Sequence, residues 1–160
     1  MAGDSALHQA IKSREIDQVR AALDDGANVD AVLQDGGYTA LLLASLYGNT
    51  DIVKLLIARG ANVNAATTWG ASALTRAAQD GQVDIVDLLL AHGANVNAKE
   101  YDGYTAVSRA ALNGHTEIVK RLLARRADLG IRTKHGHTAL SLAYENRHHD
   151  IVELLQKAGG

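Results

Sequence analysis

The chain has 160 residues and a formal net charge of −2, and 47% of its residues are hydrophobic. This composition supports a folded core and excludes general disorder, and the balanced charge argues against a general nucleic-acid binder. The absence of cysteine excludes disulfides, thiolate metal sites and thiol nucleophiles. No apolar run approaches the roughly 18 residues of a membrane span, and Met1 to Leu7 lack the regions of a secretion signal. We therefore expect a cytoplasmic protein without membrane contact.

Two short markers recur along the chain at nearly constant spacing. The first is Ser or Thr followed by Ala and then Leu or Val, and its copies begin at Ser5, Thr39, Ser72, Thr105 and Thr138. These copies lie 34, 33, 33 and 33 residues apart. The second marker, Gly-Ala-Asn-Val followed by Asp or Asn, starts 21 residues after the first, at Gly26, Gly60 and Gly93. A period that holds over five units predicts a repeat architecture.

Each unit predicts two short helices followed by a turn. The hydroxyl residue of the first marker is a good N-cap for a helix that runs to a glycine, as from Leu42 to Tyr47 before Gly48. The second helix carries apolar residues at helical spacing and ends at a left-handed glycine. In the second repeat this stripe consists of Ile52, Val53, Leu55, Leu56 and Ile57. The five repeats span about 4–34, 35–67, 68–100, 101–133 and 134–160.

The first and last repeats differ from the inner ones at positions that pack against a neighbouring repeat. Where the second repeat has Ile52, Leu55 and Leu56, the first has Gln18, Ala21 and Ala22, and the last has Gln156 in place of a leucine. A solenoid needs polar outer faces at its ends. We therefore expect residues 1–160 to be a single, self-contained domain in which the first and last repeats act as caps.

The joint pattern of T-x-L, I-V-x-L-L and G-A-x-V-N at a 33-residue period resembles the ankyrin repeat. The resemblance implies an all-α solenoid of helix-turn-helix units with projecting β-hairpin fingers. It also implies protein binding through the finger tips and first helices, which line a concave face. The sequence departs from the family pattern in three ways. It has no proline after the Thr, it keeps the motif histidine only at His8, and it has Arg126 where a left-handed glycine is expected.

The same resemblance assigns partner-binding positions to the fingers and to the ends of the first helices. These positions are Tyr38, Leu46, Tyr47, Trp69, Gln79, Asp80, Tyr101, Tyr104, Leu112, Asn113, Lys134, His135 and His137. Five of the six aromatic residues fall on these positions, and only Tyr144 falls at a stacking position. Because Tyr and Trp are favoured interface anchors, Tyr47, Trp69 and Tyr101 are the expected contacts. The alternative for Tyr38 and Tyr104 is that each packs on a neighbouring finger.

Arg76 and Arg109 stand in the same register of successive first helices. One interpretation is a basic ladder on the concave wall that binds an acidic segment of a partner. The other is that these are solvated arginines paired with the nearby Asp80 and Asn113. The sequence leaves both open.

Histidines invite a metal site, but their placement argues against one. His135 and His137 fall on a finger, whereas His148 and His149 fall between two helices, at the opposite end of a first helix. We therefore expect no metal ion and no other cofactor, and a C-terminal region whose charge depends on pH. The sequence also has no glycine-rich phosphate loop and no nucleophile elbow, so it does not predict an enzyme.

Three functions fit these patterns. The first is a monomeric interaction module that binds a partner protein. The second is an engineered or reconstructed scaffold with no native partner, which the absence of Cys and Pro favours. The third is a repeat array that binds a non-protein ligand such as a sugar or a lipid headgroup.

Overall fold

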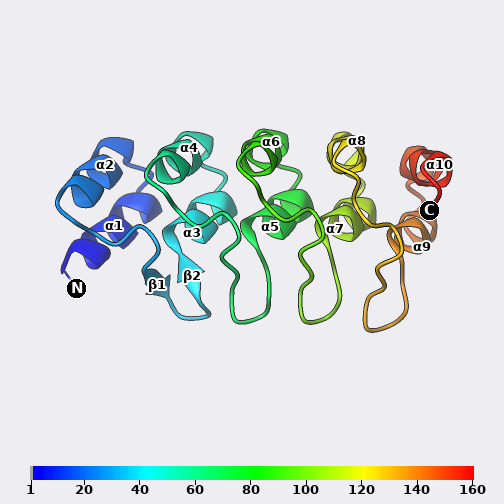
Figure 1. The fold of residues 1–160 in the computed structure, drawn as a ribbon, viewed down its shortest axis with the longest axis horizontal. Coiled ribbons are helices and arrows are strands. Elements are labelled where there is room, and N and C mark those ends of the chain that lie inside the picture. Colours follow the sequence, from blue (N-terminus) through cyan, green and yellow to red (C-terminus); the bar gives the residue numbers. More distant parts are fainter. Residues whose placement is uncertain (1) are drawn as a thin grey trace. The chain divides into compact units, whose positions relative to one another are not determined.

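The computed structural model describes residues 2–160, and these form ten helices and one two-stranded sheet (Figure 1). The chain divides into two compact units, one ending at Ala73 and the other running from Leu74 to Gly160. The first unit contains α1 (Ala2–Lys12), α2 (Ile16–Asp24), β1 (Val32–Gln34), β2 (Tyr38–Thr39), α3 (Ala40–Leu46) and α4 (Thr50–Ala58). The second contains nearly all of α5 (Ala73–Asp80), then α6 (Val83–Ala91), α7 (Ala106–Asn113), α8 (Thr116–Ala124), α9 (Ala139–Glu145) and α10 (His149–Lys157).

The first unit stacks two helix pairs beside a small hairpin. Helix α1 contacts α3, and α2 contacts α4. The first helices of the two repeats therefore lie side by side, and so do their second helices. The largest fully buried side chains between them are Leu7, Ile11, Leu41, Leu43, Ile52 and Leu56. The hairpin pairs Val32 with Thr39 and Gln34 with Tyr38 around a bulge. This hairpin lies in the first spacing between markers, which is one residue longer than the others, and its Gly36 and Gly37 have positive φ angles of 91° and 81°.

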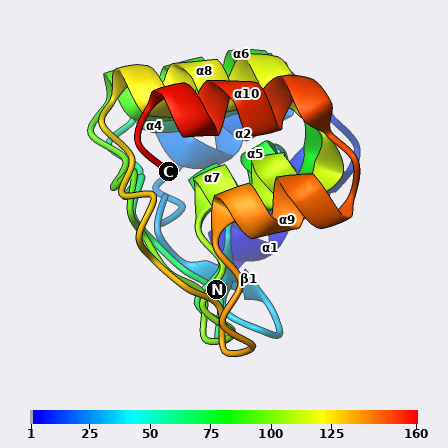
Figure 2. The same ribbon diagram turned by 90° about the vertical axis from the view of Figure 1, so that its right-hand side faces the viewer.

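The second unit arranges its six helices in two layers (Figure 2). Helix α7 contacts α9 in the layer of first helices, while α6 contacts α8 and α8 contacts α10 in the layer of second helices. The apolar stripes meet between these layers, where Leu74, Ile85, Leu89, Ile118, Leu122 and Ile151 are fully buried. The stripe that the sequence predicts for each second helix is therefore the core of this unit.

The predicted hydroxyl caps are present on three first helices. Thr39, Thr105 and Thr138 each accept a hydrogen bond from the backbone N–H three residues later. Ser108 and Ser141 bond back to the cap residue and complete capping boxes. These serines stand at the position of the motif histidine, and each closes a capping box within its own repeat. The cap predicted at Ser5 is wrong, because α1 already begins at Ala2.

Left-handed backbone occurs at more residues than the sequence predicted. Arg126 has a φ of 57°, as expected from its place in the repeat. Arg14 and Arg147 also have positive φ, 61° and 60°, at the turn where the inner repeats have glycine. At Arg14 the guanidinium donates a hydrogen bond to the carbonyl of Tyr47 at 2.7 Å. This contact between the first and second repeats offsets part of the cost of the strained backbone.

The terminal repeats agree only in part with the predicted caps. Gln18 and Ala21 on α2 and Gln156 on α10 are exposed, as expected. Ala22 is instead buried, because it lies three residues after the buried Val19 and therefore on the same face of α2. Among the described residues, no helix is long and apolar enough to cross a membrane.

Candidate functional site

The loops that precede the first helices form the fingers. We name finger two (32–39), finger three (66–72), finger four (100–105) and finger five (133–138). Fingers three, four and five are each closed by a backbone hydrogen bond of 2.9 Å, from Thr67 to Ala71, from Glu100 to Tyr104 and from Thr133 to His137. Neighbouring tips within a unit are also joined, because Thr68 N–H donates to the Gly36 carbonyl and Lys134 N–H to the Asp102 carbonyl, each at 2.9 Å.

A glycine allows finger five to approach finger four this closely. Gly103 has a φ of +89°, and a Cβ there would lie 2.7 Å from the Cα of Thr133 and 2.8 Å from the carbonyl oxygen of Arg132. Any larger residue would push the two fingers apart. The tips of fingers four and five therefore lie directly against each other.

In the first unit, the predicted binding residues differ in exposure. The Trp69 side chain is 70% exposed at the tip of finger three, while the Thr67 hydroxyl accepts a hydrogen bond from the Trp69 amide at 3.3 Å. Leu46 and Tyr47 at the end of α3 are half-buried. Tyr38 is also half-buried, and its ring lies next to Gly36 of its own finger. Among these four residues, Trp69 offers a partner the most exposed side chain.

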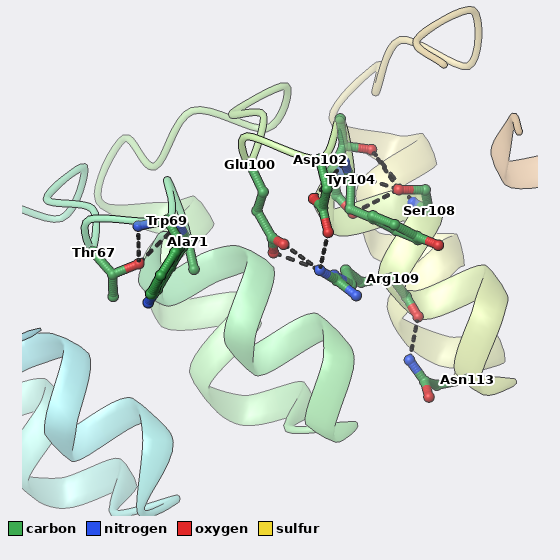
Figure 3. Close-up of polar contacts among 10 residues, drawn as sticks. Thr67, Trp69, Ala71, Glu100, Asp102, Tyr104, Ser108, Arg109 and Asn113 are labelled. Atoms are coloured by element: carbon green, nitrogen blue, oxygen red, sulfur yellow. Dashed lines mark hydrogen bonds and ion pairs between the residues drawn. The ribbon is translucent and has the colours of Figure 1, made fainter. Parts of the chain in front are cut away.

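In the second unit, finger four presents one exposed and one anchored tyrosine. Tyr101 is 71% exposed. The Tyr104 ring is half-buried, and its centroid lies 4.0 Å from the guanidinium carbon of Arg109 (Figure 3). The aromatic pair of this finger therefore divides into a free ring and a ring held against a cation.

The guanidinium of Arg109 is bound within its own repeat. Its Nε donates to Glu100 at 3.3 Å, one terminal nitrogen pairs with the other Glu100 oxygen, and the same nitrogen lies 3.3 Å from Asp102. Burial lowers the pKa of Arg109, but the hydrogen bond and the charge of Glu100, helped by Asp102, raise the pKa above its usual value. Asn113, the neighbour that one of the two interpretations paired with Arg109, binds its backbone and not its guanidinium, since the Asn113 amide donates to the carbonyl of Arg109 at 2.8 Å.

Sequence reasoning missed Glu100, a buried residue at the start of finger four. A signal was present, because Glu100 occupies the position of Thr67 and Thr133 in the neighbouring fingers. Those threonines are also buried, and their hydroxyls accept hydrogen bonds from amides of their own loops. A carboxylate at a position that otherwise holds a hydroxyl indicates a cationic partner nearby.

Helix α5, the first helix of the third repeat, carries three of the expected binding positions. Arg76 and Gln79 are half-buried, and Asp80 is exposed at the end of the helix. The Gln79 carbonyl lies 2.9 Å from Nε2 of His115, the residue that precedes α8 in the next helix pair of the unit. Among the ion pairs of the described residues, none joins Arg76 to Asp80, the neighbour that the same interpretation paired with it.

The end of α7 and finger five hold the remaining expected positions. Leu112 is half-buried and Asn113 is exposed. In finger five, Lys134 and His135 are exposed, and His137 Nδ1 lies 3.4 Å from Glu145 Oε1. Across the described residues, the structure brings no three potential metal ligands together.

Tyr144 is exposed, contrary to the prediction that it stacks. Its side chain is 73% exposed on α9, where it lines a shallow pocket of about 300 Å³ with Leu140 and Val152. The equivalent residues Ala78 and Ala111 of the preceding repeats are fully buried. The prediction failed because no other part of the described chain covers the Tyr144 side chain on α9.

Comparison with known proteins identifies the family. A family model described as ankyrin repeats (3 copies) matches residues 2–67 and 74–160. An ankyrin repeat protein of Fowlpox virus (strain NVSL) is 37% identical over 65 residues, 41% of this chain and 16% of that protein. Zygote-specific protein 3 of Chlamydomonas reinhardtii is 46% identical over 66 residues, 41% of this chain and 17% of its own. A mitochondrial disaggregase of Bos taurus is 36% identical over 61 residues, 38% of this chain and 9% of that protein.

The chain thus spans between 9% and 17% of the length of these three relatives. Ankyrin repeats are generally protein-interaction modules, and the family is typically non-enzymatic. Since the family model covers nearly all of its residues, the chain belongs to the ankyrin-repeat family.

Proposed function

We propose that this protein binds a partner protein through its finger tips and the exposed ends of its first helices. The observation that carries the proposal is the exposure of two large aromatic side chains, Trp69 and Tyr101, at 70% and 71%. Both stand at finger tips. Exposed aromatic residues of this kind are typical anchors of protein interfaces, because they combine a large apolar area with a polar group.

The fingers hold these rings on an ordered backbone. Hydrogen bonds close each loop, and a further bond joins the tips of fingers four and five. An anchor on a preformed loop loses less conformational entropy on binding than one on a flexible loop. The arrangement therefore favours recognition of a folded surface or an extended segment by finger tips that need little rearrangement.

Exposed polar residues also lie on a finger and at helix ends of the second unit. Lys134 and His135 are exposed on finger five, while Asp80 and Asn113 are exposed at the ends of α5 and α7. Protein interfaces commonly combine aromatic anchors with a polar rim that sets orientation and specificity. We assign these four residues to such a rim and expect each to contribute less to affinity than the aromatic anchors.

Site-specific photo-cross-linking tests the proposal. A photoreactive amino acid in place of Tyr101 or Trp69 should capture the same protein from a lysate of the source cells. A probe at Lys120, exposed on the second helix α8, should not capture it. With the captured protein purified, Tyr101→Ala and Trp69→Ala should each weaken affinity by about 30-fold or more, as expected for an interface hot spot.

Lys120→Ala is the matched control and should leave the affinity unchanged, because Lys120 pairs with Glu117 on its own helix, away from the fingers. If Lys120→Ala weakens binding while the two aromatic variants do not, the interface lies on the second helices and the proposal fails.

A further inference from the structure

Finger four is tied to helix α7 by a set of contacts that centre on Arg109. The guanidinium contacts Glu100 through two nitrogens, Asp102 at 3.3 Å and the face of Tyr104 at 4.0 Å (Figure 3). All three partners belong to finger four, whereas Arg109 lies in the middle of α7. The Arg109 side chain is 18% exposed and that of Glu100 is 9% exposed. A largely desolvated, two-pronged ion pair of this kind fixes both distance and orientation.

At the position of Glu100, fingers three and five have a threonine, and finger five contacts its own helix α9 through His137 and Glu145 instead. There the buried Thr67 and Thr133 hydroxyls accept hydrogen bonds from amides of their own loops, at 3.2–3.3 Å. Finger four instead uses Asp102 to accept from the Tyr104 amide, at 3.4 Å. Its buried carboxylate is therefore available to bind Arg109 rather than to close the loop.

The position of finger four also determines that of finger five. The Asp102 carbonyl accepts the Lys134 N–H at 2.9 Å. The backbone of Thr133 lies so close to Gly103 that a Cβ atom on residue 103 could not be accommodated. Because backbone contacts of this kind cannot adapt by rotating a side chain, a displacement of finger four is transmitted to finger five.

We propose that Arg109 and Glu100 are positioning residues that hold fingers four and five together as one preformed binding surface. The part of this inference that concerns partner binding rests on the proposed function. A partner contacts Tyr101 and the tip of finger five, while the guanidinium of Arg109 stays bound to its internal carboxylates. An acidic segment of a partner would have to displace two carboxylates already in place, one of them buried, so this arginine is poorly suited to bind such a segment.

Hydrogen–deuterium exchange on the full chain tests the positioning role without any partner. In Arg109→Leu and Glu100→Gln, the amides of Glu100, Gly103 and Lys134 should exchange about tenfold faster, because local opening of the fingers becomes easier. The amide of Ala111 within α7 should keep its protection. In the wild type, the Arg109 Nε–H should give a protected side-chain resonance that Glu100→Gln removes.

Arg121→Leu is the control, since it breaks the ion pair that joins Arg121 of α8 to Asp87 of α6 in the same unit. It should leave exchange in fingers four and five unchanged. Unchanged exchange in both Arg109→Leu and Glu100→Gln would overturn the proposal. Equally faster exchange in Arg121→Leu would do so as well, because it would indicate general destabilisation.

Affinity for the protein captured by cross-linking at Tyr101 tests the consequence for binding. Arg109→Leu should weaken it about tenfold through lost preorganisation, and the double variant with Glu100→Gln should lose little more. If Arg109→Leu loosens the fingers but binds as tightly as the wild type, the binding part of the inference is wrong while the proposed function stands. If Tyr101→Ala also binds normally, the proposed function itself fails, and the exchange results still decide whether Arg109 holds the fingers.

Discussion

Gly103 and Gly136 occupy the same position in fingers four and five and have nearly the same backbone, with φ of +89° and +84°. Their surroundings differ. A Cβ at Gly103 would meet backbone atoms of finger five, whereas nothing lies within 4 Å of a Cβ at Gly136. The pair separates two roles of glycine, which are conformational freedom and close approach of a neighbouring chain.

Gly103→Ala should therefore cost more stability than Gly136→Ala. At Gly136 we expect a loss of about 1 kcal/mol, which is the cost of a left-handed non-glycine residue. At Gly103 the clash with finger five adds to this, for a loss of about 3 kcal/mol. Urea unfolding followed by circular dichroism measures both. Equal losses would mean that the two fingers do not press on each other.

Individual residues also show how far local patterns reach. The left-handed backbone at Arg126 was predictable, because the residue stands at a marker position that is glycine in the first three repeats. Arg14 and Arg147 were missed because they occupy the turn between helices, where the glycine of the inner repeats indicates only the end of a helix.

At the scale of elements, two histidines join neighbouring helix pairs of the second unit. Nε2 of His115 lies 2.9 Å from the Gln79 carbonyl at the end of α5, and Nε2 of His148 lies 3.0 Å from the Leu112 carbonyl at the end of α7. Each ring lies against a glycine of the preceding repeat, where a Cβ would approach within 2.7–2.8 Å. Each contact also satisfies a carbonyl near the end of a helix.

His148→Ala tests this contact. It removes the hydrogen bond to Leu112 and the packing against Gly114, and we expect a loss of about 1–2 kcal/mol in the free energy of unfolding. The His148 side chain makes no cap hydrogen bond to α10, so loss of a helix cap does not contribute. His149→Ala is the control, since the neighbouring His149 is exposed, and its loss should stay within about 0.5 kcal/mol. A larger loss for His149→Ala would contradict this role of His148.

At the scale of the whole molecule, the repeat period continues through the boundary between the two compact units. Ser72 and Thr105 are 33 residues apart, as in the later repeats. Repeats that are stable only beside their neighbours unfold together when every interface is strong. From the sequence we therefore expect one cooperative unfolding transition for the chain.

Differential scanning calorimetry measures this cooperativity. The calorimetric enthalpy should equal the van't Hoff enthalpy, which is the criterion for a two-state transition. Gly103→Ala, a substitution in the second unit, should shift the entire transition to lower temperature. Two separated transitions, of which the variant moves only one, would show that the units unfold independently.

The helices and fingers could be predicted from the sequence because they depend on local interactions. Apolar spacing, hydroxyl caps and glycine turns act within a few residues, and the helix predicted from Leu42 to Tyr47 corresponds to α3 at Ala40–Leu46. The family also follows from these local markers, since their fixed spacing defines the repeat.

Contacts between repeats, and between a finger and its helix, were decided only by the tertiary structure. The ion pair of Arg109 with Glu100, the exposure of Tyr144 and the burial of Ala22 all depend on which surface another part of the chain covers. A periodic sequence assigns the same role to equivalent positions. Their actual roles differ, because the energy of a buried charge or an exposed ring depends on neighbours that are distant in sequence.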